Sequence, residues 1–290
     1  MRLNLQINGT QHEIETPPGE SLLAALRRLG YFDVKHGCES GDCGVCAVLL
    51  DGRLVNTCVH LAAQAEGHPI QTVASLGQHP ERGWKHTSGL HPIQAAFVES
   101  GAIQCGYCTP AQVLAATQLL DANPNPTEQD VRDALSGVLC RCTGYLKPVQ
   151  AVLRAAALLR GESVDPIAGP IPAPPDWLPE TNEGPAPAGP AAAPALSPTQ
   201  TQVMPRIQVT SETETWQRVG KPEPKVDAVK LVQGKPAFAA DFEKRDMLVA
   251  KVLHSPHAHA RIKNIDVGQA LELAGVAAVL TWKDIPRVIY

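Results

Sequence analysis

The sequence predicts an α+β fold: a small sheet domain with one helix, then a four-helix bundle, then a partial α/β segment. Three observations support this order. The first 60 residues hold two hairpin-like stretches, apolar residues recur at helical spacing from 91 to 160, and a Pro/Ala-rich stretch follows. We therefore expect domains at residues 1–78, 79–160 and 216–290, with a linker at 161–215.

The first domain is expected to contain two hairpins and one helix. Residues 2–7 and 11–16 alternate in polarity around an Asn-Gly pair, the strongest short signal for a hairpin turn. The stretch SLLAALRRLG, residues 21–30, predicts an amphipathic helix that ends at its glycine. Residues 47–58, AVLLDGRLVNTC, predict a second hairpin that turns at an Asp-Gly pair.

The second domain is expected to be helical. Apolar residues recur at three- and four-residue spacing in four stretches, residues 91–100, 109–122, 127–136 and 147–160. Thr127 with Asp130 predicts a variant capping box at the start of the third helix. Four short helices with tight connections indicate a bundle.

Regular patterning stops at residue 161 and returns near Trp216. The Pro/Ala/Gly-rich stretch between them cannot form a core, so it is expected to be an extended linker. Beyond it, three apolar runs predict strands, with a short helical stretch at 267–274. These runs are KLVQGKPAFAAD, MLVAKVLHS and VAAVLTWKD.

Composition and charge exclude several classes of protein. The net charge of −4 and pI near 6.2 provide no basic patch for nucleic acid or an acidic membrane surface. No apolar run approaches the roughly 18–20 residues that a membrane-spanning helix needs. The N-terminus lacks the pattern of a secretory signal, and Arg27-Arg28 sits inside a predicted helix rather than before an apolar leader. A cytoplasmic location is therefore expected.

Eight cysteines form two groups of four with none left over. In a reducing compartment, such a set is more typical of metal ligands than of disulfides. We therefore expect two four-coordinate sites, made by Cys38, Cys43, Cys46 and Cys58, and by Cys105, Cys108, Cys140 and Cys142.

The first group has the spacing of plant-type [2Fe–2S] proteins. Cys38, Cys43 and Cys46 read C-x4-C-x2-C, and Cys58 follows after eleven intervening residues. Glycines in the same loop permit the positive φ angles that wrapping around a cluster requires. A zinc site is the alternative, although zinc is more often held by two paired knuckles.

The second group is less decisive. Cys105 and Cys108 read C-x2-C, a knuckle that many metals share, whereas Cys140 and Cys142 read C-x-C, which is less typical of structural zinc. Spacing alone leaves both iron–sulfur and zinc open for this site.

Three longer motifs carry a family resemblance. GCESGDCGVCAVLLDGRLVNTC, IQCGYCTPAQVL and LSGVLCRCTGY resemble the iron–sulfur subunit of the xanthine dehydrogenase/aldehyde oxidase family of molybdenum hydroxylases, over about residues 2–160. The resemblance implies a plant-type ferredoxin-like (β-grasp) domain with one [2Fe–2S] cluster and a four-helix bundle with the other. It also implies that Gln104 and Cys142 approach a molybdopterin, Gln104 by a hydrogen bond and Cys142 through its sulfur.

The C-terminal part carries a second resemblance. VGKPEPKVDAVKLVQGKPAFAADF and SPHAHARIKNIDVGQALELAGVAAVLTWKDIP are similar to the start of the molybdenum-binding subunit of that family, an a/b hammerhead-like domain. No flavin domain lies between the two parts, so FAD is expected on another chain or not at all. The chain is therefore expected to form a hetero-oligomer with a partner that binds molybdenum cofactor, and to lack a complete catalytic site.

The implied function is one-electron relay from a molybdenum centre on a partner chain, through two [2Fe–2S] clusters, to FAD or another acceptor. A free-standing ferredoxin-like carrier and a zinc-stabilised interaction module are the alternatives. The substrate, whether a purine, an aldehyde or an N-heterocycle, is left open.

Other polar residues are expected to be ordinary. His254, His257 and His259 read as a turn between strands, and Lys35 and His36 as solvated. Arg141 lies between two ligands and could offset cluster charge.

Overall fold

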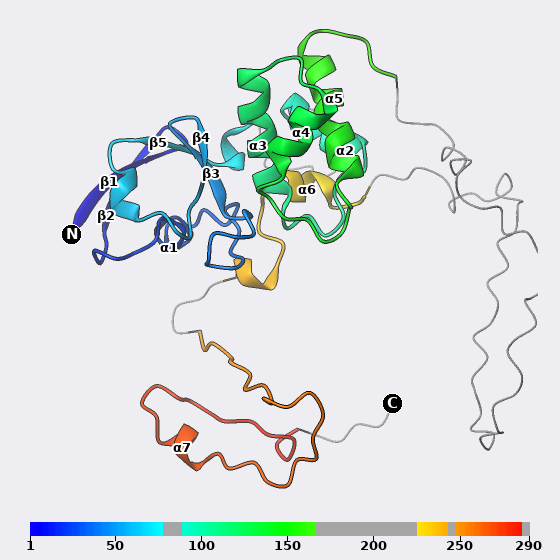
Figure 1. Ribbon diagram of the computed structural model, residues 1–290. Coiled ribbons are helices and arrows are strands. Elements are labelled where there is room, and N and C mark those ends of the chain that lie inside the picture. The colour runs from blue at the N-terminus through cyan, green and yellow to red at the C-terminus, as the bar shows by residue number, and fades with distance from the viewer. Residues whose placement is uncertain (78–88, 166–224, 243–246, 286–290) are drawn as a thin grey trace, which may run out of the picture. The chain divides into compact units, whose positions relative to one another are not determined.

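The computed structural model describes residues 1–77, 89–165, 225–242 and 247–285 (Figure 1). The chain divides into two compact units, Met1–Asp241 and Phe242–Tyr290. The predicted linker at 161–215 lies outside the described residues except for 161–165. Within the described residues, no helix is long and apolar enough to span a bilayer.

A mixed five-stranded sheet opens the first unit. Its strands are β1 (Arg2–Ile7), β2 (Thr10–Glu15), β3 (Ala47–Leu50), β4 (Arg53–Asn56) and β5 (Pro69–Gln71), in the order β2-β1-β5-β3-β4. The β1–β5 pair is parallel and the others are antiparallel. Both predicted hairpins are confirmed, whereas β5 was not predicted because three residues carry no measurable alternation.

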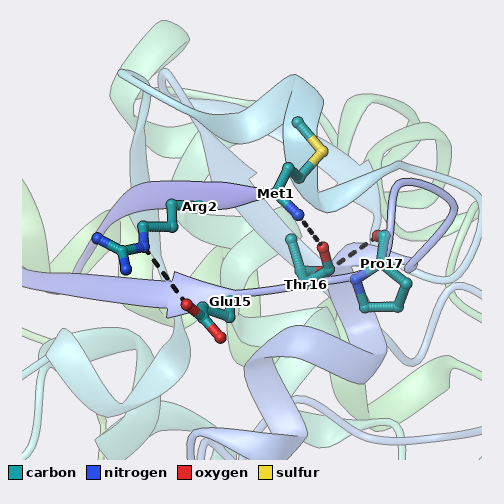
Figure 2. Close-up of a pocket in the computed structure, with 5 residues that line it drawn as sticks. All are labelled: Met1, Arg2, Glu15, Thr16 and Pro17. Carbon is teal, nitrogen blue, oxygen red and sulfur yellow. Dashed lines mark hydrogen bonds and ion pairs between the residues drawn. The ribbon is translucent and has the colours of Figure 1, made fainter.

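Turn chemistry sets the register of these hairpins. Asn8 and Gly9 both have positive φ, as a two-residue hairpin turn of this kind requires, and Ile7 pairs with Thr10. At the open end of the same hairpin, the Met1 ammonium donates to the carbonyl oxygen of Thr16 at 2.8 Å (Figure 2). The surface hollow beside this contact is lined by Met1, Arg2, Glu15, Thr16 and Pro17, and no cysteine borders it.

Helix α1 (Leu22–Arg28) packs against the sheet and confirms the predicted helix. The Ser21 side chain caps it by accepting a hydrogen bond from the Ala24 N–H. The sheet and α1 share one core, which includes Leu3, Leu5, Ile7, Leu22, Leu26 and Ile70. This core holds the ends of β3 and β4 fixed, and two of the cysteines lie beside those ends.

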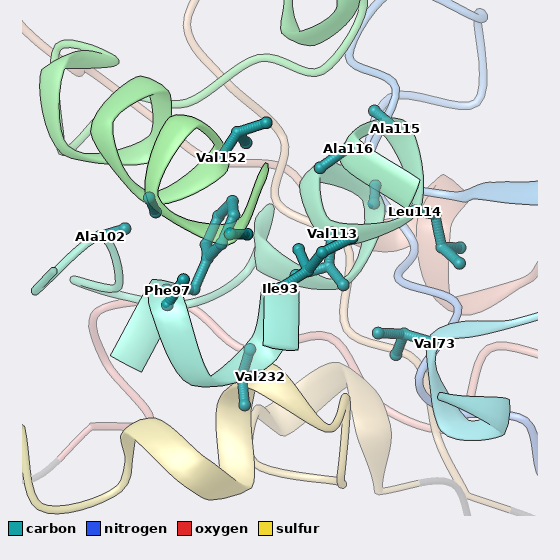
Figure 3. Close-up of a cluster of buried hydrophobic side chains, with 14 of the residues drawn as sticks. Val73, Ile93, Phe97, Ala102, Val113, Leu114, Ala115, Ala116, Val152 and Val232 are labelled. Carbon is teal, nitrogen blue, oxygen red and sulfur yellow. The ribbon is translucent and has the colours of Figure 1, made fainter. Parts of the chain in front are cut away.

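Four helices follow, as predicted: α2 (Pro92–Glu99), α3 (Thr109–Ala122), α4 (Glu128–Leu135) and α5 (Leu146–Leu159). Thr127 and Asp130 form the expected capping box at the start of α4. Phe97, Val113 and Val152 meet in the centre of the helices, each fully buried (Figure 3). The α+β class is therefore confirmed.

One predicted strand is wrong. The run KLVQGKPAFAAD, residues 230–241, instead begins with the last three residues of helix α6 (Ala228–Val232), which packs against α2 and α3. Its apolar residues are buried against those two helices. A short apolar run fits a buried helix as well as a buried strand, so the sequence alone could not separate the two. Gly234, with a φ of +72°, turns the chain beyond the helix. The first unit thus extends to Asp241, beyond the residue-216 boundary expected from composition.

The second unit has little regular structure. Helix α7 (Gly268–Leu271) lies within the predicted helical stretch, but the described residues form no strand at 247–255 or 276–284, so those two predictions are also wrong. A strand needs a neighbour for its backbone N–H and C=O groups, and this unit supplies none among its described residues. Large apolar side chains are exposed here, including Leu248, Val252, Leu253, Ile262 and Leu280.

Candidate metal centres

The first cysteine group lies on a loop and a hairpin end. Cys38 and Cys43 are on the loop that follows α1, and Cys46 directly precedes β3. Because β3 and β4 pair in register, the chain after β4 returns Cys58 to the neighbourhood of Cys46. The Thr57 hydroxyl donates to the Cys46 carbonyl oxygen at 2.7 Å and fixes this return.

The loop backbone is shaped for close approach. Glu39, Gly41 and Gly44 all have positive φ angles, which turn successive peptide groups inward. A Cβ on Gly37 would stand 2.6 Å from the Cys43 sulfur, so any larger residue at position 37 would displace that sulfur.

Hydrogen bonds and burial act differently on the first four sulfurs. The Cys38 sulfur accepts hydrogen bonds from the N–H groups of Ser40 and Cys43, each at 3.4 Å. Interactions with Ser40, then Cys43, lower the pKa of the Cys38 thiol to about 6. Burial, and next the Cys46 sulfur, raise the pKa of the Cys58 thiol to about 11. A positively charged iron would offset the cost of ionising Cys58.

The second cysteine group gathers at helix ends. Cys108 is the N-cap residue of α3, and Cys105 lies in the turn before it. Cys140 and Cys142 occupy the connection between α4 and α5, where Tyr145 takes a left-handed conformation. Because these four cysteines lie at helix ends and in connections, their side chains are not committed to a helix face and can converge on one site.

Burial dominates the pKa values in the second group. It raises the pKa of Cys108, where the Cys140 sulfur adds to the effect, and the pKa of Cys105. At Cys140 burial opposes ionisation, yet hydrogen bonds led by the Thr143 side chain hold the thiol pKa below its usual value. The Thr143 hydroxyl lies 3.1 Å from the Cys140 sulfur.

Neighbouring sulfurs in each group act on one another's pKa, and not only in pairs: the Cys38 sulfur also raises the pKa of Cys58, and the Cys105 sulfur also raises the pKa of Cys108. Cys46 interacts with Cys58, and the Cys43 N–H donates to Cys38. In the second group, Cys105 interacts with Cys142 and Cys108 with Cys140.

The number and kind of ligands in each group bear on the choice of metal. A single zinc ion would draw four thiolates to about 2.3 Å from one centre. Within the part of the chain that the structure describes, no three His, Cys, Asp or Glu side chains approach closely enough to share one ion. Four cysteines in each group can supply two thiolates to each iron of a [2Fe–2S] cluster, so the donor sets fit such a cluster.

Two hydrogen bonds connect the cysteine groups. The N–H of Leu139, next to Cys140, donates to the carbonyl oxygen of Cys43 at 2.9 Å. The Tyr107 hydroxyl, between Cys105 and Cys108, donates to the His36 carbonyl oxygen at 2.5 Å. The first of these hydrogen bonds therefore links Cys43 of the first group directly to the residue before Cys140 of the second.

Other residues singled out from the sequence take varied positions. Gln104 and Arg141 are exposed beside the second group, as is Cys142. His254, His257 and His259 are exposed on irregular chain. The interpretation of Lys35 as solvated is wrong: its side chain is 1% exposed, because it pairs with Asp241.

Three protein families match consecutive parts of the chain. Residues 5–71 match the 2Fe-2S iron-sulfur cluster binding domain, and residues 72–153 match the [2Fe-2S] binding domain. Residues 233–290 match the a/b hammerhead domain of aldehyde oxidase and xanthine dehydrogenase. These matches define the class: an iron–sulfur protein joined to the beginning of a molybdenum-enzyme domain.

Individual relatives agree with this class. The nicotinate dehydrogenase small FeS subunit of Eubacterium barkeri is 43% identical over 155 residues, which are 53% of this chain and 93% of that protein. The aldehyde oxidoreductase of Megalodesulfovibrio gigas is 33% identical over 97% of this chain, but this chain spans only 26% of its length. The solved aldehyde oxidoreductase from Desulfovibrio desulfuricans superposes with a TM-score of 0.70 at 31% identity, over 98% of this chain and 27% of that one.

The chain belongs to the xanthine dehydrogenase/aldehyde oxidoreductase family of molybdenum hydroxylases. Within that family it is an iron–sulfur, electron-transfer part of an oxidoreductase. It spans nearly all of the small subunit that it matches and about a quarter of the larger enzymes.

Sequence reasoning missed three residues that make contacts next to the two cysteine groups. Asp241 and Phe238 lie in a stretch that the pattern assigned to a strand, and Tyr107 was read only as part of a motif. No local spacing could have found these contacts, because Lys35 and Asp241 are 206 residues apart.

Proposed function

We propose that this chain holds one [2Fe–2S] cluster on each cysteine group and relays electrons singly from a molybdenum cofactor on a partner chain to FAD or another acceptor. The observation that carries the proposal is the presence of four free cysteines in each of two groups, together with the hydrogen bond from Leu139 to Cys43 that joins the groups. A cluster supplies reversible one-electron chemistry when bound. The chain supplies spacing, burial and hydrogen bonds.

In this proposal, the first cluster is held by Cys38, Cys43, Cys46 and Cys58, and the second by Cys105, Cys108, Cys140 and Cys142. Backbone N–H groups aimed at the Cys38 sulfur stabilise its thiolate and would raise the reduction potential there. The ferredoxin-like (β-grasp) arrangement of residues 1–78 and the helical domain at 79–160 belong to the same proposal.

The second cluster is proposed to face the molybdenum cofactor. Gln104, Cys105 and Cys142 are all exposed on this group, so a cofactor on another chain could reach them. Gln104 would donate or accept a hydrogen bond at the pterin, and the Cys142 sulfur would be the closest cluster ligand. The Cys43–Leu139 contact would then carry electrons onward to the first cluster.

The partner is proposed to be a molybdenum-cofactor-binding chain, in line with the family match over residues 233–290. The apolar side chains exposed in the second unit favour such an association, because isolated they would face water. A separate FAD-binding subunit remains part of the proposal, and the whole would be a hetero-oligomer. A cytoplasmic location is proposed because all eight cysteines are free of disulfides.

Metal analysis and co-purification test the proposal. The purified chain should contain about four iron and four acid-labile sulfide, because each cluster contributes two of each. The chain isolated from its native source should carry a molybdenum-containing partner. Stoichiometric zinc in either site would refute the cluster assignment, and an iron-loaded chain without any partner would indicate a free-standing carrier instead.

A further inference from the structure

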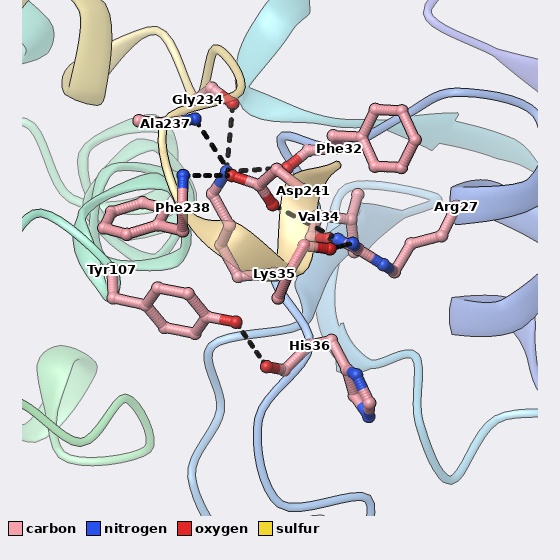
Figure 4. Close-up of polar contacts among 11 residues, drawn as sticks. Arg27, Phe32, Val34, Lys35, His36, Tyr107, Gly234, Ala237, Phe238 and Asp241 are labelled. Atoms are coloured by element: carbon pink, nitrogen blue, oxygen red, sulfur yellow. Dashed lines mark hydrogen bonds and ion pairs between the residues drawn. The ribbon is translucent and has the colours of Figure 1, made fainter. Parts of the chain in front are cut away.

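A buried cluster of charges joins Asp241, the last residue of the first unit, to Arg27 and Lys35 near its start (Figure 4). The Lys35 ammonium donates to the Asp241 carboxylate at 2.8 Å, and both side chains are almost fully buried. The same ammonium donates to the carbonyl oxygens of Phe32 and Gly234. Arg27 lies 3.5 Å from the other Asp241 oxygen and donates to the carbonyl oxygen of Ala240.

This cluster is costly to break. Removing one partner of a buried ion pair leaves an uncompensated charge, whereas the intact pair satisfies both. The Ala237 and Phe238 N–H groups also donate to Asp241, so its carboxylate organises the turn that contains it. Gly234 packs so tightly on the Asp33 side chain that an added Cβ would stand 2.4 Å away.

The segment 225–241 also reaches both cysteine loops. Leu231 covers Gly106, and the Phe238 ring meets the Tyr107 ring edge-on with centroids 4.8 Å apart. Gly106 and Tyr107 are the two residues between Cys105 and Cys108. Tyr107 in turn donates to the carbonyl oxygen of His36, two residues before Cys38, and Lys35 lies 5.2 Å from the Phe238 ring.

We propose that the segment 225–241 is a clamp that holds the two cysteine loops together, with Lys35, Asp241 and Phe238 as its positioning residues. Lys35 and Asp241 fix the segment to the first loop, and Phe238 presses Tyr107 onto the His36 carbonyl. The clamp rests on the proposed function insofar as it sets the distance between two clusters. Opening it should leave each cluster bound, because no cysteine belongs to it, but should loosen the contact between the loops.

The test uses the full-length, cluster-loaded chain and three variants. Asp241→Asn removes the charge at constant size, Phe238→Leu removes the ring contact, and Asp227→Asn alters an exposed ion pair with Lys225 in the same segment as the matched control. Two properties are measured: the magnetic coupling between the two reduced clusters, by electron paramagnetic resonance, and hydrogen exchange of peptides that contain Leu139.

Asp241→Asn should keep its iron, weaken the coupling, and speed exchange at Leu139 by about 100-fold, since breaking a buried pair is strongly destabilising. Phe238→Leu should weaken the coupling in the same direction, and Asp227→Asn should change neither property. If Asp241→Asn does not fold, Phe238→Leu alone decides.

Unchanged coupling and Leu139 exchange in a folded clamp variant would overturn the proposal, since the segment would then cover the loops without positioning them. The same holds if Asp227→Asn has an equal effect. A wild-type chain without four iron would instead refute the proposed function, and the exchange comparison would still decide whether the segment holds the loops together.

Discussion

Replacing Gly44 with alanine should separate the two cysteine groups without touching a cysteine. Gly44 lies between Cys43 and Cys46, and an added Cβ would stand 1.9 Å from the carbonyl oxygen of Gly137. Its φ of +69° is also a left-handed conformation, which costs a non-glycine residue about 1–2 kcal/mol. Relieving the clash should cost a further 1–3 kcal/mol or so, the usual range for overpacking.

Gly52→Ala is the matched control. Gly52 has a similar φ of +75°, but nothing lies within 4 Å of its added Cβ, so it should show only the backbone cost. Urea unfolding, followed by the visible absorbance of the clusters, should give a loss for Gly44→Ala that exceeds the loss for Gly52→Ala by about 1–3 kcal/mol. Inter-cluster magnetic coupling should weaken only in Gly44→Ala. Equal losses in the two variants would refute the close contact between the cysteine loop and Gly137.

Three further changes have simple expected outcomes. Cys43→Ser should lower the iron content from about four to about two per chain and remove one of two spectroscopic signals, because the two groups are separate; loss of both signals from a folded chain would contradict this. Thr127→Ala should cost about 1 kcal/mol of unfolding free energy by removing the cap of α4, and no change in the urea midpoint would argue against the capping box. A chain ending at Asp241 should remain monomeric and hold both clusters, whereas one ending at Gly161 should unfold at lower urea because the surface under α6 is uncovered; equal midpoints would show that α6 adds no stability.

Sequence reasoning succeeded where the signal was local. The hairpin at Asn8-Gly9 and the helix that starts after Thr127 follow from a few neighbouring residues. The four helices of the second domain were predicted nearly to their ends because apolar residues recur in them at three- and four-residue spacing, although α3 is buried on all sides from Thr109 to Thr117. The two cysteine groups were also assigned from spacing, and their role as cluster ligands stays a prediction.

Prediction failed where structure depends on distant contacts. Strand β5 forms because Ile70 fits between β1 and β3, and its own three residues carry no period. Helix α6 forms where its apolar residues can pack against α2 and α3, which are more than 100 residues earlier in the chain. Lys35 resembles any solvated lysine in sequence, and its burial follows only from Asp241, a carboxylate far along the chain. The stretches 247–255 and 276–284 are apolar runs typical of strands, but no described residue pairs with them.

The clamp changes what a molybdenum-binding partner would meet. The hammerhead match begins at residue 233, yet the first compact unit extends to Asp241, so the start of the matched domain is already packed on the cluster-binding part. Asp241 cannot leave that position without stranding Lys35 in a buried site. The partner chain proposed above would therefore meet the chain beyond Asp241, where the apolar residues are exposed. The Lys35–Asp241 ion pair then has a second consequence: it anchors the point at which the chain leaves the first unit to the residues just before the Cys38 loop.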